Sequence, residues 1–231
     1  MKEHKQAVRI QTSFLSRIEK KALIFMAKRM PEKINSDHLT IIGFAGAIIS
    51  GAGYILVNLN VNYLWLASLG LFLNWFGDSL DGTLARVRNL QRPLYGFFID
   101  HTIDGLTILV ICLGAGLSPL ISFSVAMLVL VGYLLLSIST YINTYLEHEF
   151  RISYGKLGPT EFRLIVILIN TLFIYLPIGN QQLSVVGHAF KLFDVIGFVI
   201  ALALFSIYLI SFIKDKKKYE KIDPPHHYTT R

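Results

Sequence analysis

Four aspartates stand in a part of the chain that is otherwise rich in apolar residues. Asp78 and Asp81 lie three positions apart, and Asp100 and Asp104 lie four positions apart. On a helix these spacings place both members of a pair on one face, so each helix presents two carboxylates. Oxygen-only ligand sets suit hard divalent cations such as Mg²⁺ or Mn²⁺. The spacing therefore predicts a site for one or two of these ions.

Two small residues and an arginine follow the first pair of aspartates. Gly82 and Ala85 leave the helix surface bare beside the carboxylates, and Arg86 offers a planar guanidinium group to a phosphate. An in-line attack at phosphorus needs metal ions that neutralise the phosphates and a spare carboxylate that takes the proton from the nucleophile. Together these residues predict a site that binds and breaks a diphosphate.

The segments that carry these residues have the composition of membrane helices. Of the 231 residues, 53% are hydrophobic. A bilayer core about 30 Å thick is crossed by roughly 20 apolar helical residues. Continuous apolar runs joined by short loops favour one all-α integral membrane domain over residues 1–213, and they argue against a β-barrel. The six windows of suitable length are 39–58, 62–86, 94–116, 121–146, 161–180 and 190–213.

The aspartates lie on the second and third of these windows. The connection from Arg86 to Pro93 is short, so the two helices must be antiparallel neighbours whose carboxylates converge near one end. Four unpaired ionised aspartates at membrane depth would cost about 2.5–3.5 kcal/mol each, roughly 10 kcal/mol together. The nearby arginines cannot cancel all four charges at close range, whereas divalent cations can.

The distribution of positive charge predicts the orientation. Of 22 Lys and Arg residues, 21 lie on one side of the predicted spans, and only Lys191 lies on the other. The positive-inside rule then places both termini, the site and the two loops nearest it in the cytoplasm. The cations lie next to the spans and match no nucleic-acid motif, so no nucleic acid partner is expected.

Two segments flank the predicted spans. From Phe14 to Phe25, apolar residues recur every three or four positions among lysines, and Pro31 ends the pattern. This predicts an interfacial amphipathic helix over 13–30. The polar, charged stretch 214–231 predicts a disordered cytoplasmic tail.

The sequence resembles the CDP-alcohol phosphotransferases, also called CDP-alcohol phosphatidyltransferases. Their signature reads D-x2-D-G-x2-A-R, then eight or nine residues, then G-x3-D-x3-D. Every defining position is present here, from Asp78 through Arg86, followed after nine residues by Gly96 and the second aspartate pair. The stretch SDHLT is similar to the family's Pro-Asn or Pro-Asp before Leu-Thr, although Ser36 replaces the proline.

The resemblance implies roles for individual residues. Asp78, Asp81 and Asp100 would hold two metal ions, and Asp104 would contact the second ion and act as the base that activates the acceptor hydroxyl. The acceptor oxygen would attack the β-phosphorus, cytidine monophosphate (CMP) would leave, and the protein would be a homodimer. The cytidine diphosphate would contact five residues, which are Asp37, Thr40, Gly82, Ala85 and Arg86.

Three further residues are candidates for binding the acceptor. Lys156 and Arg163 lie at the cytoplasmic start of the fifth span, where they could reach a phosphate on the acceptor. Helix capping and topogenic charge explain them equally well. His101 directly follows the third aspartate, so it faces either the edge of the site or a neighbouring helix. Asp194 lies toward the opposite membrane face and is expected to be a paired structural group.

The signature serves two branches of the family. In one, CDP-diacylglycerol is the donor and a polar alcohol attacks; in the other, CDP-choline or CDP-ethanolamine is the donor and diacylglycerol attacks. The short six-span chain is similar to bacterial phosphatidyltransferases and favours the first branch. The stretch DHTID at 100–104 is similar to the Asp-His-x-x-Asp of the second branch.

A divalent-cation channel or transporter is the alternative from another class, because intramembrane carboxylates also line ion paths. Such a protein would carry acidic residues through the whole membrane depth. Here the aspartates gather at one end, beside Arg86, and this distribution favours the enzyme.

Overall fold

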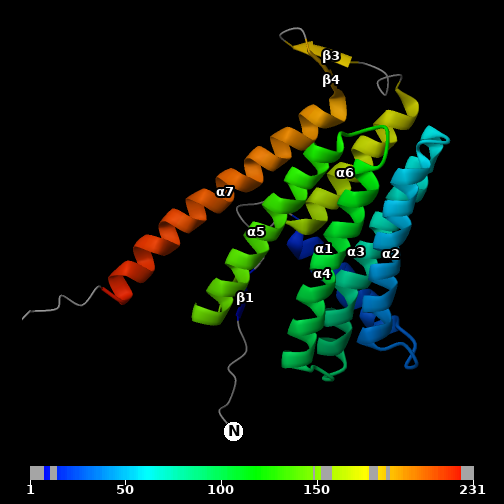
Figure 1. The fold of residues 1–231 in the computed structure, drawn as a ribbon. Coiled ribbons are helices and arrows are strands. Elements are labelled where there is room, and N and C mark those ends of the chain that lie inside the picture. The colour runs from blue at the N-terminus through cyan, green and yellow to red at the C-terminus, as the bar shows by residue number, and fades with distance from the viewer. Residues whose placement is uncertain are drawn as a thin grey trace, which may run out of the picture.

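The computed structural model describes residues 8–10, 15–147, 149–151, 158–176, 182–185 and 188–224. Helices dominate this part of the chain, which confirms the all-α fold class (Figure 1). A short 3₁₀ helix (Val61–Tyr63) precedes the third α-helix. The α-helices are α1 (Ser16–Arg29), α2 (Ser36–Leu56), α3 (Leu64–Val87), α4 (Pro93–Gly116), α5 (Phe123–Glu147), α6 (Pro159–Tyr175) and α7 (Leu192–Ile222).

Two short strand pairs accompany the helices. The strand β1 (Val8–Ile10) runs parallel to β2 (Glu149–Arg151), and β3 (Gln182–Val185) pairs antiparallel with β4 (His188–Lys191). The β3–β4 hairpin lies at the end of the bundle opposite the α3–α4 connection (Figure 1). The sequence pattern did not predict these strands, which are three or four residues long.

Four of the described helices are long and apolar enough to cross a bilayer, namely α2, α4, α5 and α7. This makes the chain a multi-pass membrane protein, with two fewer such helices than the six windows predicted. The helix α3 has 24 residues but carries Asn74, both aspartates of the first pair and Arg86. The helix α6 has only 17 residues, about 26 Å at 1.5 Å per residue, which is shorter than a typical hydrocarbon core.

Two helices end at residues other than those of the predicted windows. The helix α6 ends at Tyr175 instead of 180, because Leu176 precedes a proline and adopts an extended conformation. The helix α7 continues to Ile222, well into the tail predicted to begin at 214. Lysine and glutamate favour helix, and Asn143 of α5 forms hydrogen bonds with the part of α7 beyond residue 213. Its amide donates to Asp215 at 2.7 Å, and Tyr219 donates to its carbonyl oxygen at 2.9 Å.

Glycines allow α2 and α3 to pack with their backbones in direct contact. A Cβ atom on Gly77 would lie 2.3 Å from the backbone nitrogen of Gly43, and one on Gly46 would lie 2.4 Å from that of Asn74. Small residues at membrane helix interfaces permit this close approach. The amide of Asn74 also donates to the carbonyl of Gly43 at 3.0 Å. The α2–α3 contact therefore fixes the start of α2 against the acidic end of α3.

We expect Gly77→Ala to lower the melting temperature in detergent by several degrees, since overpacking costs about 1–3 kcal/mol. The added methyl group meets rigid backbone, so the two helices must separate. Thermal unfolding followed by circular dichroism measures the effect. The matched control is Gly105→Ala on α4, where a Cβ atom meets nothing within 4 Å. Equal melting temperatures for both variants would contradict the packing argument.

The helix α1 packs on α3 near the acidic residues. Its buried residues Leu23 and Ala27 join a cluster with Leu80 and Leu84 of α3. Its Ile18 and Phe25 remain exposed, by 68% and 57% respectively. One face of α1 is thus docked on the protein, and another presents apolar side chains outward.

Arg88, directly after α3, holds the connection between α1 and α2. Its guanidinium donates to the backbone carbonyls of Met30 at 2.8 Å and Pro31 at 2.9 Å, and also to that of Ile34. A single cationic side chain thus donates to several carbonyl groups in the connection that follows α1. It fixes the start of α2 relative to the end of α3.

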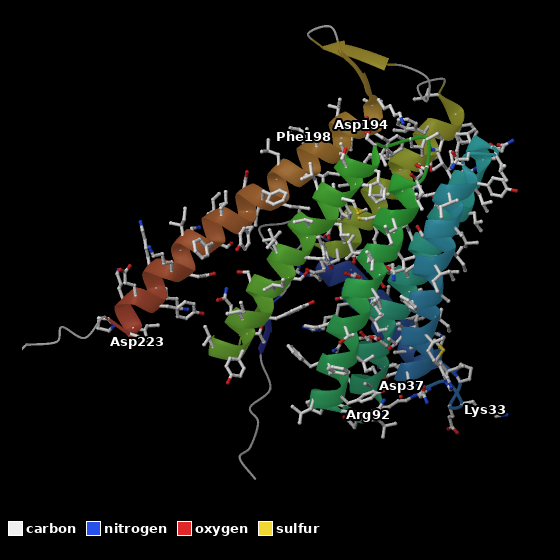
Figure 2. The ribbon with its side chains drawn as sticks, viewed as in Figure 1. Lys33, Asp37, Arg92, Asp194, Phe198 and Asp223 are labelled. Carbon is white, nitrogen blue, oxygen red and sulfur yellow. The ribbon has the colours of Figure 1, made fainter. Side chains whose placement is uncertain are left out.

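Asp194 has the structural role predicted for it. It lies at the opposite end of the bundle from Asp37 and Arg92 (Figure 2). Its carboxylate accepts hydrogen bonds from the backbone N–H and, at 2.8 Å, the hydroxyl of Ser122, which precedes α5. These bonds join α7 to the start of α5.

Candidate active site

The two aspartate pairs converge on one small cavity. Asp78 and Asp81 from α3 and Asp100 and Asp104 from α4 all line it, with a volume of about 10 Å³. Such a volume accommodates about one water molecule. The short α3–α4 connection produces this arrangement, because it makes the two helices run antiparallel with their acidic ends together.

Each aspartate of the first pair has a defined partner. Asp78 Oδ2 lies 2.8 Å from Arg163 Nη2 of α6, forming a largely buried ion pair. Asp81 Oδ2 accepts a hydrogen bond of 2.7 Å from Thr40 of α2, and its other oxygen accepts the backbone N–H of Gly82. The predicted residue Thr40 therefore contacts the site through Asp81. Three helices hold the first carboxylate pair in place.

Several residues of the cavity were not singled out in the sequence. Asn74 and Thr107 line it beside the carboxylates, with Phe44 and Ile103 as apolar neighbours. Asn74 is buried, with 3% of its surface exposed. A polar amide in the middle of an apolar span was a signal that could have identified Asn74. Thr107 lies one turn beyond Asp104 but gives no comparable signal, because threonine is common in membrane helices.

The ligands around the cavity suit a hard cation in kind and in charge. Four carboxylates, the Thr40 hydroxyl and the Asn74 amide all offer oxygen. Among the described residues, however, no three His, Cys, Asp or Glu side chains form a ready metal-binding group. In the structure, Asp78 is engaged by Arg163 and Asp81 by Thr40, each through its Oδ2 atom.

A second, larger pocket of about 470 Å³ opens near the acidic cavity. Asp37 and Ala85, both predicted to contact the nucleotide, line it together with Arg88 and Arg92. Ser36 lines this pocket and donates to the backbone carbonyl of Asp81 at 2.9 Å. The pocket therefore adjoins the carboxylates and has room for a nucleotide.

Arg92 and Asp37 form an exposed ion pair at this pocket, and they lie side by side in Figure 2. The guanidinium also lies 4.0 Å from the ring centroid of Tyr95. The hydrogen bond to Asp37 raises the pKa of Arg92 above its already high ordinary value. Because the pair is solvated, it is weak and can exchange for an anionic ligand.

The predicted binding residues Gly82, Arg86 and His101 do not line either cavity. Arg86 donates to Thr83 at 3.0 Å, and its guanidinium passes over Gly82, 3.3 Å from where a Cβ atom would lie. His101 is packed between the rings of Phe97 and Tyr141, at centroid distances of 4.1 and 4.7 Å. Its Nδ1 lies 3.4 Å from Asp100 Oδ2. The third acceptor candidate, Lys156, is outside the described residues.

Acidic pairs converging at one end of a helical membrane protein, beside a nucleotide-sized pocket, are the features of a membrane-embedded transferase that acts on a diphosphate. The chain belongs to the CDP-alcohol phosphatidyltransferase family, whose model matches residues 34–209. It is therefore a transferase of substituted phosphate groups in phospholipid biosynthesis. Members of this family generally depend on divalent cations.

Two relatives support the family assignment. The chain is 34% identical to an archaetidylinositol phosphate synthase of Pyrococcus horikoshii over 154 residues, which cover 67% of this chain and 78% of that protein. It is 27% identical to cholinephosphotransferase 1 of Gallus gallus over 143 residues, which cover 60% of this chain and 42% of that protein. The resemblance seen in the signature is thus confirmed.

Proposed function

We propose that the chain transfers a substituted phosphate from a CDP-linked lipid, CDP-diacylglycerol, to the hydroxyl group of a polar alcohol and releases CMP. The observation that carries this proposal is the convergence of four carboxylates on one cavity next to a pocket of about 470 Å³. The carboxylates supply the charge and the base that phosphoryl transfer needs, and the pocket supplies room for the nucleotide.

The four aspartates, Asp78, Asp81, Asp100 and Asp104, would hold two Mg²⁺ or Mn²⁺ ions, which when bound would neutralise the diphosphate. Asp104 would also accept the proton of the acceptor hydroxyl as its oxygen attacks the β-phosphorus. The bond from that phosphorus to the bridging oxygen breaks, and CMP leaves with the bridging oxygen. The apolar walls formed by Phe44 and Ile103 would limit access of water to the reacting phosphorus.

The nucleotide would occupy the larger pocket. Asp37 and Ala85 line its wall, and the bare helix surface at Ala85 would let the cytidine approach the backbone. Arg86 and Gly82 would contact the diphosphate, and Thr40 would orient Asp81 through their hydrogen bond. Arg92 would be free to exchange Asp37 for a phosphate, since their ion pair is exposed.

The acceptor would bind on the α6 side of the acidic cavity. Arg163 pairs there with Asp78, which lines the cavity, and a guanidinium can bind a phosphate group through two hydrogen bonds. Lys156 and His101 would complete this side of the site. The relative from Pyrococcus horikoshii is named for an inositol phosphate lipid, so a phosphorylated polyol is the acceptor class we propose.

The second candidate function is a reaction in which the head group, and not the lipid, is linked to CDP. The DHTID stretch and the similarity to cholinephosphotransferase 1 both favour it. In that reaction a CDP-aminoalcohol would be the donor and diacylglycerol the acceptor. The positions of the carboxylates are compatible with either direction, because each forms the same phosphate ester bond.

We further propose the membrane arrangement. The helices α3 and α6 would complete six spans by burying their polar residues against the rest of the protein, and α1 would lie in the interface with Ile18 and Phe25 in the lipid. The charge distribution supports placing both termini and the site in the cytoplasm. The active form would be a homodimer, as the family resemblance implies.

The decisive experiment measures CMP release by purified protein with Mg²⁺ or Mn²⁺. CDP-diacylglycerol and CDP-ethanolamine are each tested against a panel of acceptors that includes inositol, inositol phosphate, glycerol phosphate and diacylglycerol. We expect CMP only with CDP-diacylglycerol and a polar acceptor. Release only from CDP-ethanolamine with diacylglycerol would establish the second candidate, and no release from any pair would refute both.

Replacing Arg163 is expected to raise the KM for a phosphorylated acceptor at least tenfold with little change in the KM for the donor. A charge-assisted hydrogen bond contributes about 1.5–3 kcal/mol, which corresponds to this factor. Steady-state CMP release by Arg163→Gln measures this KM. The acceptor KM of Arg163→Lys should lie between those of Arg163→Gln and wild type, because lysine retains the charge but cannot donate two parallel hydrogen bonds to a phosphate. Lys214→Gln, the same charge change on α7, is the control. An unchanged acceptor KM in Arg163→Gln would remove Arg163 from the acceptor site.

A further inference from the structure

Glu19 of α1 bridges two helices that carry active-site residues. Its Oε1 atom accepts a hydrogen bond of 2.6 Å from Thr160 of α6. The same oxygen accepts a bond of 2.9 Å from the indole N–H of Trp75 and a longer one of 3.4 Å from Ser79, both on α3. One carboxylate oxygen thus joins three helices.

A reciprocal contact ties α6 back to α1. Glu161 is buried, and its carboxylate accepts the backbone N–H of Leu15, just before α1, at 2.8 Å. Its other oxygen accepts the backbone N–H of Gly158, at the start of α6, at 3.0 Å. Acidic side chains at a helix start satisfy N–H groups that have no partner within the helix. The starts of α1 and α6 are therefore linked twice, by Glu19 of α1 with Thr160 of α6 and by Glu161 of α6 with Leu15 before α1.

These contacts lie next to the ion pair between Arg163 and Asp78. Ser79 is the neighbour of Asp78 on α3, and Thr160 precedes Arg163 by three residues, about one turn of α6. The Glu19 bridge and the Arg163–Asp78 pair therefore join the same two helices within about one turn of each other. Glu19 lies before residue 34, so it is outside the region that matches the family.

We propose that Glu19 is a positioning residue that sets the distance between Arg163 and the acidic cavity, and thereby the affinity for the acceptor. This inference rests on the acceptor role proposed for Arg163. Because α1 presents Ile18 and Phe25 outward, the same contact couples the seating of α1 on the membrane surface to the geometry of the site. The donor side, at Asp37 and Ala85, is lined by residues of α2, α3 and their flanking loops and by none of α6, so a shift of α6 should leave it unchanged.

The test compares Thr160→Val with Thr171→Val in steady-state CMP release. Thr160→Val removes only the α6 arm of the bridge, whereas Thr171 on the same helix donates to Ile167 within α6. We expect Thr160→Val to raise the acceptor KM about three- to tenfold, the value of one hydrogen bond, with donor KM unchanged. Thr171→Val should match wild type. The increase in acceptor KM should be larger for Glu19→Ala than for Thr160→Val. It should be smaller for Glu19→Gln than for Glu19→Ala, because the amide oxygen of glutamine still accepts hydrogen bonds.

A second readout does not depend on activity. Hydrogen–deuterium exchange of peptides covering 158–166 should increase in Thr160→Val and Glu19→Ala but not in Thr171→Val. Increased exchange with an unchanged acceptor KM would show a purely structural contact and overturn the positioning role. Unchanged exchange would overturn the bridge itself. If wild type releases no CMP, the proposed function fails and the acceptor part of the inference with it, while exchange still decides whether the bridge exists.

Discussion

Asp104→Asn is expected to lower the rate of CMP release by about 10²–10⁴-fold, the usual contribution of a positioned general base. Asparagine has nearly the same shape but cannot take the proton from the acceptor hydroxyl. The residue lines the acidic cavity rather than the larger pocket, so the affinity for CMP should remain near the wild-type value. Single-turnover CMP release and equilibrium binding of CMP, both with Mn²⁺ present, separate the two quantities.

Asp194→Asn is the control for this variant. It makes the same change in a buried aspartate of the same protein, but at the opposite end of the bundle (Figure 2). It weakens the bonds to Ser122 and should lower the melting temperature without changing the rate per folded molecule. Turnover by Asp104→Asn at the wild-type rate would remove Asp104 from the role of base. Loss of CMP binding would instead show that it supports the nucleotide.

Local spacing was enough to predict that the four aspartates converge. The intervals within each aspartate pair fix a common helix face, and the short connection before Pro93 forces α3 and α4 to be antiparallel. Neither inference needs tertiary information. The same holds for α2, α4 and α5, whose observed bounds lie within three residues of the predicted windows at both ends.

Contacts between distant segments were not predictable in this way. The pairing of Arg163 with Asp78 joins residues 85 positions apart, and the bridge from Glu19 to Thr160 joins residues 141 apart. Nothing in the local pattern around Arg163 distinguishes an arginine that pairs with an aspartate of the cavity from one that only marks the end of a helix. The continuation of α7 was missed for a related reason, because the polar residues that favour a tail by composition also favour helix once Asn143 binds the segment.

Removal of divalent cations is expected to abolish CMP release, and Mg²⁺ or Mn²⁺ should restore it. The reason is the charge of the acidic cavity, where four carboxylates face a ligand that is itself a diphosphate. Without cations these groups repel each other across the cavity in a medium of low dielectric constant. Turnover after exhaustive chelation, and again after addition of each cation, measures this. Full activity after chelation would contradict a cation-dependent mechanism.

The same repulsion predicts that Asp81→Asn changes stability in opposite directions with and without cations. In cation-free protein, losing one of the four like charges should raise the melting temperature, because the asparagine oxygen can still accept from Thr40. In wild type, a cation at 100 times its Kd should add about 2.7 kcal/mol to the free energy of unfolding, and Asp81→Asn should lose most of this gain. Thermal unfolding in both conditions measures the two shifts. Asp194→Asn, whose carboxylate lies far from the cavity, should instead lower the melting temperature equally in both. If Asp81→Asn lowered it equally as well, the four carboxylates would not share a cation, and Asp81 would be a structural partner of Thr40 alone.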